Sequence, residues 1–318
     1  MVEDSQFEMK EIHLKYKKIF NSLPDCVSTN SLVIPGYEDE CVDVITLTGS
    51  SLSSNEQFPD LIKDLKGALG SKFYPVVRLS DGEFNFLLED QWPGPWWPML
   101  EKMKKIAGVM KRRLSYSVAF SNASYSGENR VSRTLAKSLR RKAIESLFLI
   151  GKHGRLAPHL SLTLKPFQAD YVLPFLALLS TYGSNKVFRS MIPFYFVYPL
   201  LLSQHGDFLF LGQRVLLVHS AEGEKRSNIV RSVEERGAAS IDWLTIPNTE
   251  TFDAKLELSG YIGKIDVVFF GLGVFKLVII NQFACVGVPV IDAGYVFEVW
   301  NDPDLGVTRP FCKYLKGD

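Results

Sequence analysis

The stretch R-V-L-L-V-H-S-A-E-G-E, Arg214 to Glu224, decides the fold. It begins with a short apolar run, and a segment of helical length follows it. The same alternation then repeats downstream. The apolar runs are 214–220, 241–246, 266–271 and 288–292, and the segments between them are 224–236, 250–262 and 274–286. This spacing predicts parallel strands joined by right-handed crossovers, and hence an α/β fold with a Rossmann-like, doubly wound, mostly parallel sheet.

Upstream of this half, Tyr74 to Leu79 is predicted to be another buried strand, followed by a short helix. An amphipathic helix precedes the strand and ends at Gly70, with Leu61 and Leu65 on its apolar face. Further helical patterns cover 8–21 and 128–149. We expect an N-terminal helical segment and one large domain with three parts. The segment is 1–70 and the domain is 71–318, divided into a donor motif with a helical insert (71–212), the Rossmann-like half (213–300) and a tail (301–318).

Composition limits the classes of function. The chain has 318 residues, of which 46% are hydrophobic and 22% charged, with a formal net charge of +1, so a globular protein without a nucleic-acid footprint is expected. Four cysteines lie far apart, which favours reduced thiols. No secretory signal begins the sequence, and the apolar region Tyr171 to Leu202 is interrupted, so we expect a buried helix there, no transmembrane segment and a cytoplasmic protein.

The stretch V-V-R-L-S-D-G-E-F, Val76 to Phe84, is open to two interpretations. Ser80 and Glu83 match a capping box, in which the glutamate reaches back to the start of a helix. Alternatively, Asp81 and Glu83 are hard oxygen ligands for Mg²⁺ or Mn²⁺ on a substrate phosphate. Gly82 would let that phosphate approach, and Arg78 would neutralise a carboxylate or hold the phosphate.

Three more candidate sites follow predicted strands, at the edge where doubly wound sheets bind ligands. In H-S-A-E-G-E, Gly223 permits a tight turn before a helix that can bind an anion, and Glu222 is a candidate for a sugar hydroxyl. The stretch F-G-L-G-V-F-K resembles a dinucleotide fingerprint through Gly271 and Gly273, but Lys276 stands where the third glycine belongs.

The third of these sites is V-I-D-A-G-Y, Val290 to Tyr295. Asp292 directly follows an apolar run, and it is a candidate general base, an acceptor for a sugar hydroxyl, or the cap of the next turn. Gly294, in the small-residue turn that comes next, is a candidate contact for a nucleotide sugar.

These motifs, in this order, resemble the GT-D fold glycosyltransferases, a family first catalogued as a domain of unknown function. R-L-S-D-G-E-F is similar to the family's R-F-G-D-G-E-F, and the strand ending in E-G-E is similar as well. The resemblance spans about 73–300. The remaining matching stretches are Y-G-S-N-K-V-F-R-S (182–190), T-I-P-N-T-E-T-F-D (245–253) and V-I-D-A-G-Y-V-F-E-V-W (290–300).

The resemblance implies transfer of a hexose from a nucleotide sugar, commonly a UDP-sugar, to a glycan, glycoprotein or other hydroxyl acceptor. It implies a Mn²⁺ or Mg²⁺ ion held through a D-x-E motif. The residues carried over are Asp81 and Glu83 for the metal, with Arg78, Arg189, Glu222, Asn248 and Asp292 near donor or acceptor. Asp292 and Glu83 are the candidate catalytic residues. Ser80 and Tyr295 depart from the family pattern. Two alternatives therefore stay open: a non-catalytic nucleotide-sugar-binding protein, and a Rossmann-type methyltransferase or dehydrogenase suggested by Gly271 and Gly273.

Overall fold

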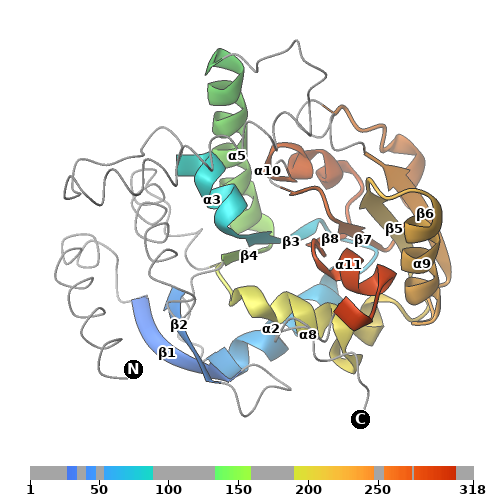
Figure 1. The fold of residues 1–318 in the computed structure, drawn as a ribbon, viewed down its shortest axis with the longest axis horizontal. Coiled ribbons are helices and arrows are strands. Elements are labelled where there is room, and N and C mark those ends of the chain that lie inside the picture. Colours follow the sequence, from blue (N-terminus) through green and yellow to red (C-terminus); the bar gives the residue numbers. More distant parts are fainter. Residues whose placement is uncertain are drawn as a thin grey trace.

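Six parallel strands form the central sheet of the computed structural model, in the order β4-β3-β8-β7-β5-β6 (Figure 1). The structure describes residues 27–33, 41–47, 54–88, 133–158, 190–246, 254–273 and 276–305. The strands of the sheet are β3 (Tyr74–Leu79), β4 (Arg155–Pro158), β5 (Arg214–His219), β6 (Ser240–Thr245), β7 (Val267–Phe270) and β8 (Pro289–Asp292). The predicted doubly wound, parallel α/β fold is confirmed.

Helices cover both faces of this sheet. The α-helices are α2 (Ser54–Ala68), α3 (Asp81–Leu88), α5 (Arg133–His153), α8 (Val197–Leu202), α9 (Gly223–Glu234), α10 (Lys276–Ile279) and α11 (Val296–Asn301). The 3₁₀ helices are η2 (Phe194–Phe196), η3 (Gln204–Leu209), η4 (Ser259–Tyr261) and η6 (Ile280–Cys285). Helices α3, α5 and α10 pack on one face, and α2, α8, α9 and α11 pack on the other (Figure 1).

The two cores follow from the alternation of side chains along each strand. In β3, Val77 and Leu79 belong to the core under α3 and α5, while Val76 belongs to the core under α2 and α8. All six residues of β3 are buried, as expected of a central parallel strand. An arginine at position 78 of such a strand is therefore an anomaly that requires a buried partner.

The connections that leave the sheet diverge at its carboxyl edge. The chain after β3 and after β7 enters α3 and α10 on one face, whereas the chain after β5 and after β8 enters α9 and α11 on the other. Neighbouring strands whose connections leave on opposite faces create the crevice in which doubly wound sheets bind ligands. A ligand-binding site is therefore expected at the carboxyl edge of β3, β8, β7 and β5.

Several predicted elements are confirmed. Helix α2 buries Leu61 and Leu65 and is followed by Gly70 at φ +64°, and its apolar side chains share a core with β5 and β7. The apolar region before residue 202 contains the predicted buried helix, α8. Within the described residues, no helix is both long enough and apolar enough to cross a membrane.

Other expectations were wrong or incomplete. The segment 250–262 was expected to be helical, but its described part holds the single 3₁₀ turn η4. The short edge strand β4 was not predicted. The N-terminal segment was expected to be helical, yet it contains an antiparallel pair, β1 (Val27–Val33) and β2 (Cys41–Leu47). The helical pattern at 8–21 lies outside the described residues.

Replacement of Leu65 tests whether α2 packs against the sheet as part of the core that it shares with α8. The Leu65 side chain is fully buried against the sheet, so Leu65→Ala should reduce the free energy of unfolding by about 2–5 kcal/mol. Leu211→Ala is the matched control, because Leu211 is 67% exposed, and it should change stability by less than about 0.5 kcal/mol. Urea unfolding followed by circular dichroism measures both, and equal losses would contradict the packing described.

Candidate functional site at the carboxyl edge of the sheet

Four buried charged side chains form a continuous chain of contacts at the carboxyl edge. The ammonium Nζ of Lys276 lies 2.9 Å from Glu83 Oε1 and 2.7 Å from Asp292 Oδ2. Asp292 Oδ1 in turn lies 3.5 Å from Nη2 of Arg78. The exposed fractions are 3% for Glu83, 5% for Lys276, 1% for Asp292 and 5% for Arg78. The two positive and two negative charges balance, so the group is neutral as a whole.

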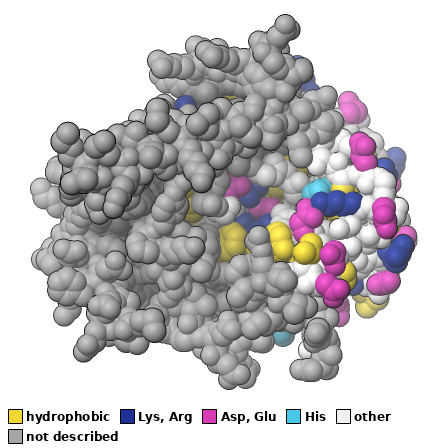
Figure 2. All heavy atoms as spheres, in the orientation of Figure 1, with side chains coloured by type: hydrophobic (Ala, Val, Ile, Leu, Met, Phe, Trp, Pro, Cys, Tyr) yellow, Lys and Arg dark blue, Asp and Glu magenta, His cyan; other side chains and the backbone are white. Residues whose placement is uncertain are grey.

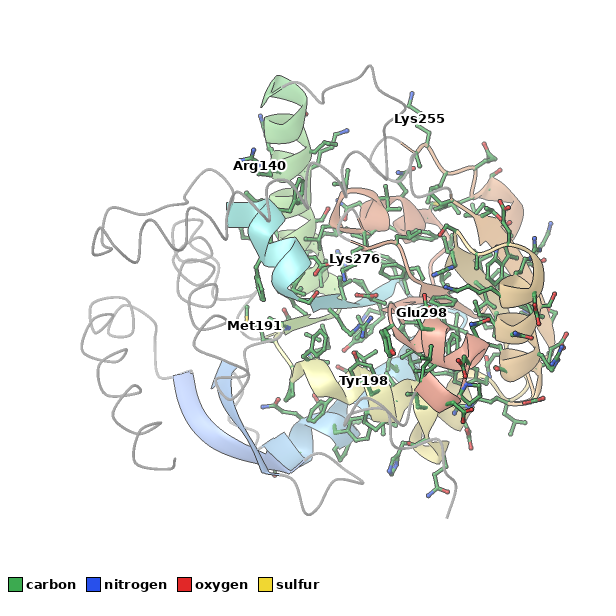
Figure 3. All side chains as sticks on the ribbon, in the orientation of Figure 1. Arg140, Met191, Tyr198, Lys255, Lys276 and Glu298 are labelled. Carbon is green, nitrogen blue, oxygen red and sulfur yellow. The ribbon has the colours of Figure 1, made fainter. Side chains whose placement is uncertain are left out.

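This charge chain crosses the edge of the sheet from one helical layer to the other. Glu83 comes from α3 and Lys276 from α10, on one face, and Asp292 ends β8. Arg78 lies in β3, and its Nη1 donates a hydrogen bond of 2.9 Å to the hydroxyl of Tyr198 in α8, on the other face. Figure 3 shows Lys276 and Tyr198 on opposite sides of the central strands. Figure 2 shows acidic and basic side chains gathered in a hollow near the middle of this face.

Glu83 reaches back to Ser80, as the predicted capping box requires of the glutamate. Its Oε2 accepts hydrogen bonds of 2.8 Å from both the backbone N–H and the hydroxyl of Ser80, at the start of α3. Its other oxygen, Oε1, accepts from Lys276. Both carboxylate oxygens are therefore already engaged.

Asp292 and Arg78 hold each other in place. Asp292 Oδ2 also accepts from the Arg78 backbone N–H at 3.1 Å, while the guanidinium lies over the rings of Phe194 and Tyr198, about 5 Å from each centroid. Gly294 makes room for this arrangement. Its φ is +43°, and a Cβ built there would lie 1.6 Å from Arg78 Nη2. Gly294 thus has a structural role, and its predicted contact with a nucleotide sugar stays a prediction.

The ion pairs favour the charged forms of Asp292 and Lys276. Burial raises the pKa of the Asp292 carboxyl, but the cations of Lys276 and Arg78 outweigh burial and hold this pKa below its ordinary value. Burial lowers the pKa of Lys276, but Asp292 and Glu83 outweigh it, so that pKa lies above its ordinary value. A general base works best with a pKa near the working pH, so Asp292 is poorly tuned for that predicted role.

The described residues do not fit a divalent cation at Glu83. One of its oxygens caps Ser80, and the position between Glu83 and Asp292 is filled by the Lys276 ammonium. Among the residues that the structure describes, no group of three His, Cys, Asp or Glu side chains could hold a metal. The side chain of Asp81, the other predicted ligand, lies outside the described part of the structure. A metal role for Asp81 stays a prediction.

A second set of polar and aromatic side chains surrounds His219, the last residue of β5. The His219 ring lies 4.6 Å from the Phe297 ring and 6.4 Å from the Trp243 ring, measured between centroids, and Arg226 lies over Trp243. Burial, and then the Lys225 ammonium, lower the pKa of His219 to about 4, so the ring is neutral at pH 7. Its Nδ1 accepts the Ala221 backbone N–H at 2.9 Å, which places the ring proton on Nε2 as a hydrogen-bond donor.

The other residues predicted to contact a ligand differ in their surroundings. Gly271 packs against rings, since a Cβ there would lie 2.7 Å from Phe297 and 2.9 Å from His219. Gly273 has φ +58° with open space around it. Glu222 is exposed and precedes α9 without a side-chain capping bond. Gly82 lies in the first turn of α3.

Two of the predicted contacts, Arg189 and Asn248, lie outside the described residues. Their roles stay predictions.

Three residues of this edge were not predicted as site residues. Lys276 stood out in the sequence as a departure from the glycine fingerprint, which was a usable signal. His219 was visible at the end of a strand, where a histidine is a candidate for function. Tyr198 gave no signal, because it sits in an apolar run and its partner Arg78 is distant in sequence.

The ion pairs at the amino edge of the sheet are more exposed than those at the carboxyl edge. At the amino end of β4, Arg155 contacts Asp60 and Asp64, and at the amino end of β5, Arg214 contacts Asp266. The side chains of these pairs are 17% to 42% exposed. Buried charges are thus concentrated at the carboxyl edge, where ligands of such sheets bind.

Comparisons with known proteins give two matches of fold. Scans of protein-family models and of curated proteins find no match. Among solved structures, the chain is similar to a selenomethionine-substituted domain of unknown function 1792, at 14% identity and a TM-score of 0.42, covering 78% of this chain and 86% of that one. A second structure of that domain, described as having a distinct glycosyltransferase fold, matches at 14% identity and a TM-score of 0.44, over 77% and 85% of the chains.

Replacement of Gly294 tests the buried charge chain. Gly294→Ala combines a positive φ with a collision against Arg78, so it should lower the free energy of unfolding by about 3 kcal/mol or more, as expected when a buried ion pair is disrupted. Gly273→Ala is the matched control, because it has a similar φ but no neighbour, and it should cost about 1–2 kcal/mol. Chemical unfolding of both variants distinguishes them, and losses of the same size would argue against the contact.

The lowered pKa of His219 gives a pH prediction. Between pH 6.5 and pH 4 the unfolded chain binds a proton at this position while the folded chain does not, so stability should fall as the pH falls through this window. After allowance for partial exposure, the loss is about 2 kcal/mol. Urea unfolding at pH 7 and pH 4.5 should show this loss in the wild type and less of it in His219→Gln. The exposed histidine variant His205→Gln should behave like the wild type.

Proposed function

We propose that the chain binds a nucleotide sugar at the carboxyl edge of its sheet and transfers the hexose to a hydroxyl group of an acceptor. The observation that carries this proposal is the buried chain of Glu83, Lys276, Asp292 and Arg78 at that edge. Burial of an ion costs several kcal/mol, and apolar side chains would fill the same space without that cost. Such an arrangement at the ligand edge is expected where a binding site needs fixed charges.

Two sets of donors at the end of β5 support binding of a diphosphate. Helix α9 begins at Gly223, just after the carboxyl end of β5, so its first turn lies at the carboxyl edge. The N-cap residue Glu222 makes no side-chain capping bond, which leaves the N–H groups of this turn available to an anion. The neutral His219, at the end of the strand that precedes α9, carries a hydrogen-bond donor at Nε2. The choice of a UDP-hexose as the sugar donor rests on the order of motifs in the sequence. None of the contacts described here would distinguish uracil from another base.

The transfer forms one bond and breaks another at the anomeric carbon. The acceptor oxygen bonds to that carbon while the bond from carbon to the diphosphate oxygen breaks, and the nucleoside diphosphate leaves with the electron pair. Fixed N–H donors near the leaving group stabilise the charge that develops there. The acceptor proton needs a base; Asp292 stays the predicted one, although Lys276 and Arg78 occupy its oxygens. The role of Mn²⁺ or Mg²⁺ also stays a prediction.

A specific observation favours a second function, that of a non-catalytic nucleotide-sugar-binding protein. All four carboxylate oxygens of Glu83 and Asp292, the two predicted catalytic residues, are already engaged in hydrogen bonds or ion pairs. A binding protein requires no carboxylate with an accessible lone pair. A dinucleotide enzyme is less well supported, because the rings of Phe297 and His219 press on Gly271, where a pyrophosphate would have to approach.

Titration calorimetry with UDP tests the proposed site. UDP should bind to the wild type, and His219→Phe should bind it about tenfold more weakly, since it keeps the ring contacts but removes one hydrogen-bond donor. His205→Phe, at an exposed position in η3, is the control and should bind like the wild type. Absence of any UDP binding would reject the proposal.

Release of sugar separates the two candidate functions. An active glycosyltransferase should release free hexose from a UDP-hexose slowly by transfer to water, measurable as UDP formation by chromatography. Binding of the UDP-hexose without any UDP formation would favour the non-catalytic protein. Tight binding of NAD or S-adenosylmethionine in place of UDP would point to the dinucleotide or methyltransferase alternative.

A further inference from the structure

We propose that the ammonium of Lys276 is the resident cation of this edge, in the position where a divalent metal ion would otherwise bridge Glu83 and Asp292. Two consequences follow. Removal of the Lys276 side chain should open a divalent cation site between the two carboxylates, and ligand binding by the wild type should not require a metal at Glu83. The second consequence rests on the proposed function, and the first does not.

The geometry is that of a bridging cation. Nζ of Lys276 lies 2.9 Å from an oxygen of Glu83 and 2.7 Å from an oxygen of Asp292, so one positive group joins two carboxylates from different elements. Mg²⁺ binds oxygen at about 2.1 Å, so each side chain would need to move by less than about 1 Å to reach an ion at that point. The two carboxylates are therefore already placed as ligands, with an ammonium between them.

The charge balance explains why the wild type should reject a metal here. With Lys276 present, the buried group of four side chains is neutral, and a divalent ion would add two uncompensated positive charges beside the ammonium. Without Lys276, Glu83 and Asp292 carry two negative charges against the single positive charge of Arg78. The net charge of the group is then −1, so a divalent cation would bring it to +1, compared with +2 when the lysine is present.

The backbone around the cluster holds the two carboxylates in place independently of Lys276. Glu83 is tied to Ser80 through two hydrogen bonds to its other oxygen, and Asp292 is tied to the backbone N–H of Arg78. Both anchors remain when the lysine side chain is shortened. A cation arriving at the vacated position would therefore meet preorganised ligands rather than mobile ones.

Binding of Mn²⁺, followed as loss of the free-ion signal in electron paramagnetic resonance, tests the metal part. The probe is Mn²⁺ alone, without nucleotide. Lys276→Ala should bind one Mn²⁺ at least about tenfold more tightly than the wild type, and Lys276→Ala combined with Glu83→Gln should lose that gain. Lys225→Ala is the matched control: Lys225 contacts a single carboxylate, that of Glu298, in a half-buried pair, and its removal should give no gain.

A thermal melt covers the case in which Lys276→Ala folds poorly. Because a ligand that binds the native state alone stabilises it, Mn²⁺ should raise the melting temperature of Lys276→Ala and leave that of the wild type unchanged. Two results would overturn the proposal. One is tight Mn²⁺ binding by the wild type that Glu83→Gln removes, and the other is a folded Lys276→Ala without any gain in Mn²⁺ affinity.

A UDP titration with and without Mn²⁺ tests the ligand part separately. In the wild type, Mn²⁺ should change the UDP affinity no more than it does in Glu83→Gln, whereas Lys276→Ala should bind UDP more tightly with Mn²⁺ than with EDTA. Failure of both proteins to bind UDP would reject the proposed function and leave the Mn²⁺ result standing. A wild type that binds UDP with Mn²⁺ alone, and loses this dependence in Glu83→Gln, would reject the resident-cation proposal.

Discussion

The structure depends on one constraint, namely that four charges buried at the carboxyl edge must satisfy one another. Arg78 lies in a strand that is otherwise apolar and fully buried, so it needs Asp292. Asp292 also pairs with Lys276, whose ammonium lies at the oxygen that the Arg78 guanidinium does not contact. Glu83 completes the balance and starts α3 through Ser80. The absence of a side chain at Gly294 follows from the same requirement, since the Arg78 guanidinium occupies that space.

Most of the sheet could be predicted from sequence because its signals are local. A buried parallel strand is a short apolar run, and β3, β5 and β8 begin and end within about two residues of the predicted runs. The failures have physical reasons. Strand β4 has four residues and follows a long helix directly, so no run of its own marks it. The segment 250–262 is long enough for a helix, and a helix was predicted from this length. The connection between β6 and β7 does not need one, and its described part contains only the 3₁₀ turn η4.

The candidate site could be located from sequence, but the partners of its residues could not. Asp292 and Gly294 were predicted as site residues because they follow a predicted strand. Ser80 and Glu83 were predicted to contact each other because they match a capping box. Those inferences use residues within a few positions of each other. The contacts of Lys276 with Glu83 and of Arg78 with Asp292 join distant segments and depend on the order of strands in the sheet. A single sequence contains no local signal for that order, so a metal ligand and an ion-pair partner look the same at Glu83.

The crossing of the sheet edge by this charge chain has a mechanical consequence. It ties α3 and α10 on one face to α8 on the other through Asp292 and Arg78. A sliding of either helical layer across the strands would pull opposite charges apart in an interior of low dielectric constant, where their attraction is strong. The two layers should consequently move as one rigid body, and a hinge or shear motion between them is disfavoured at this end of the sheet.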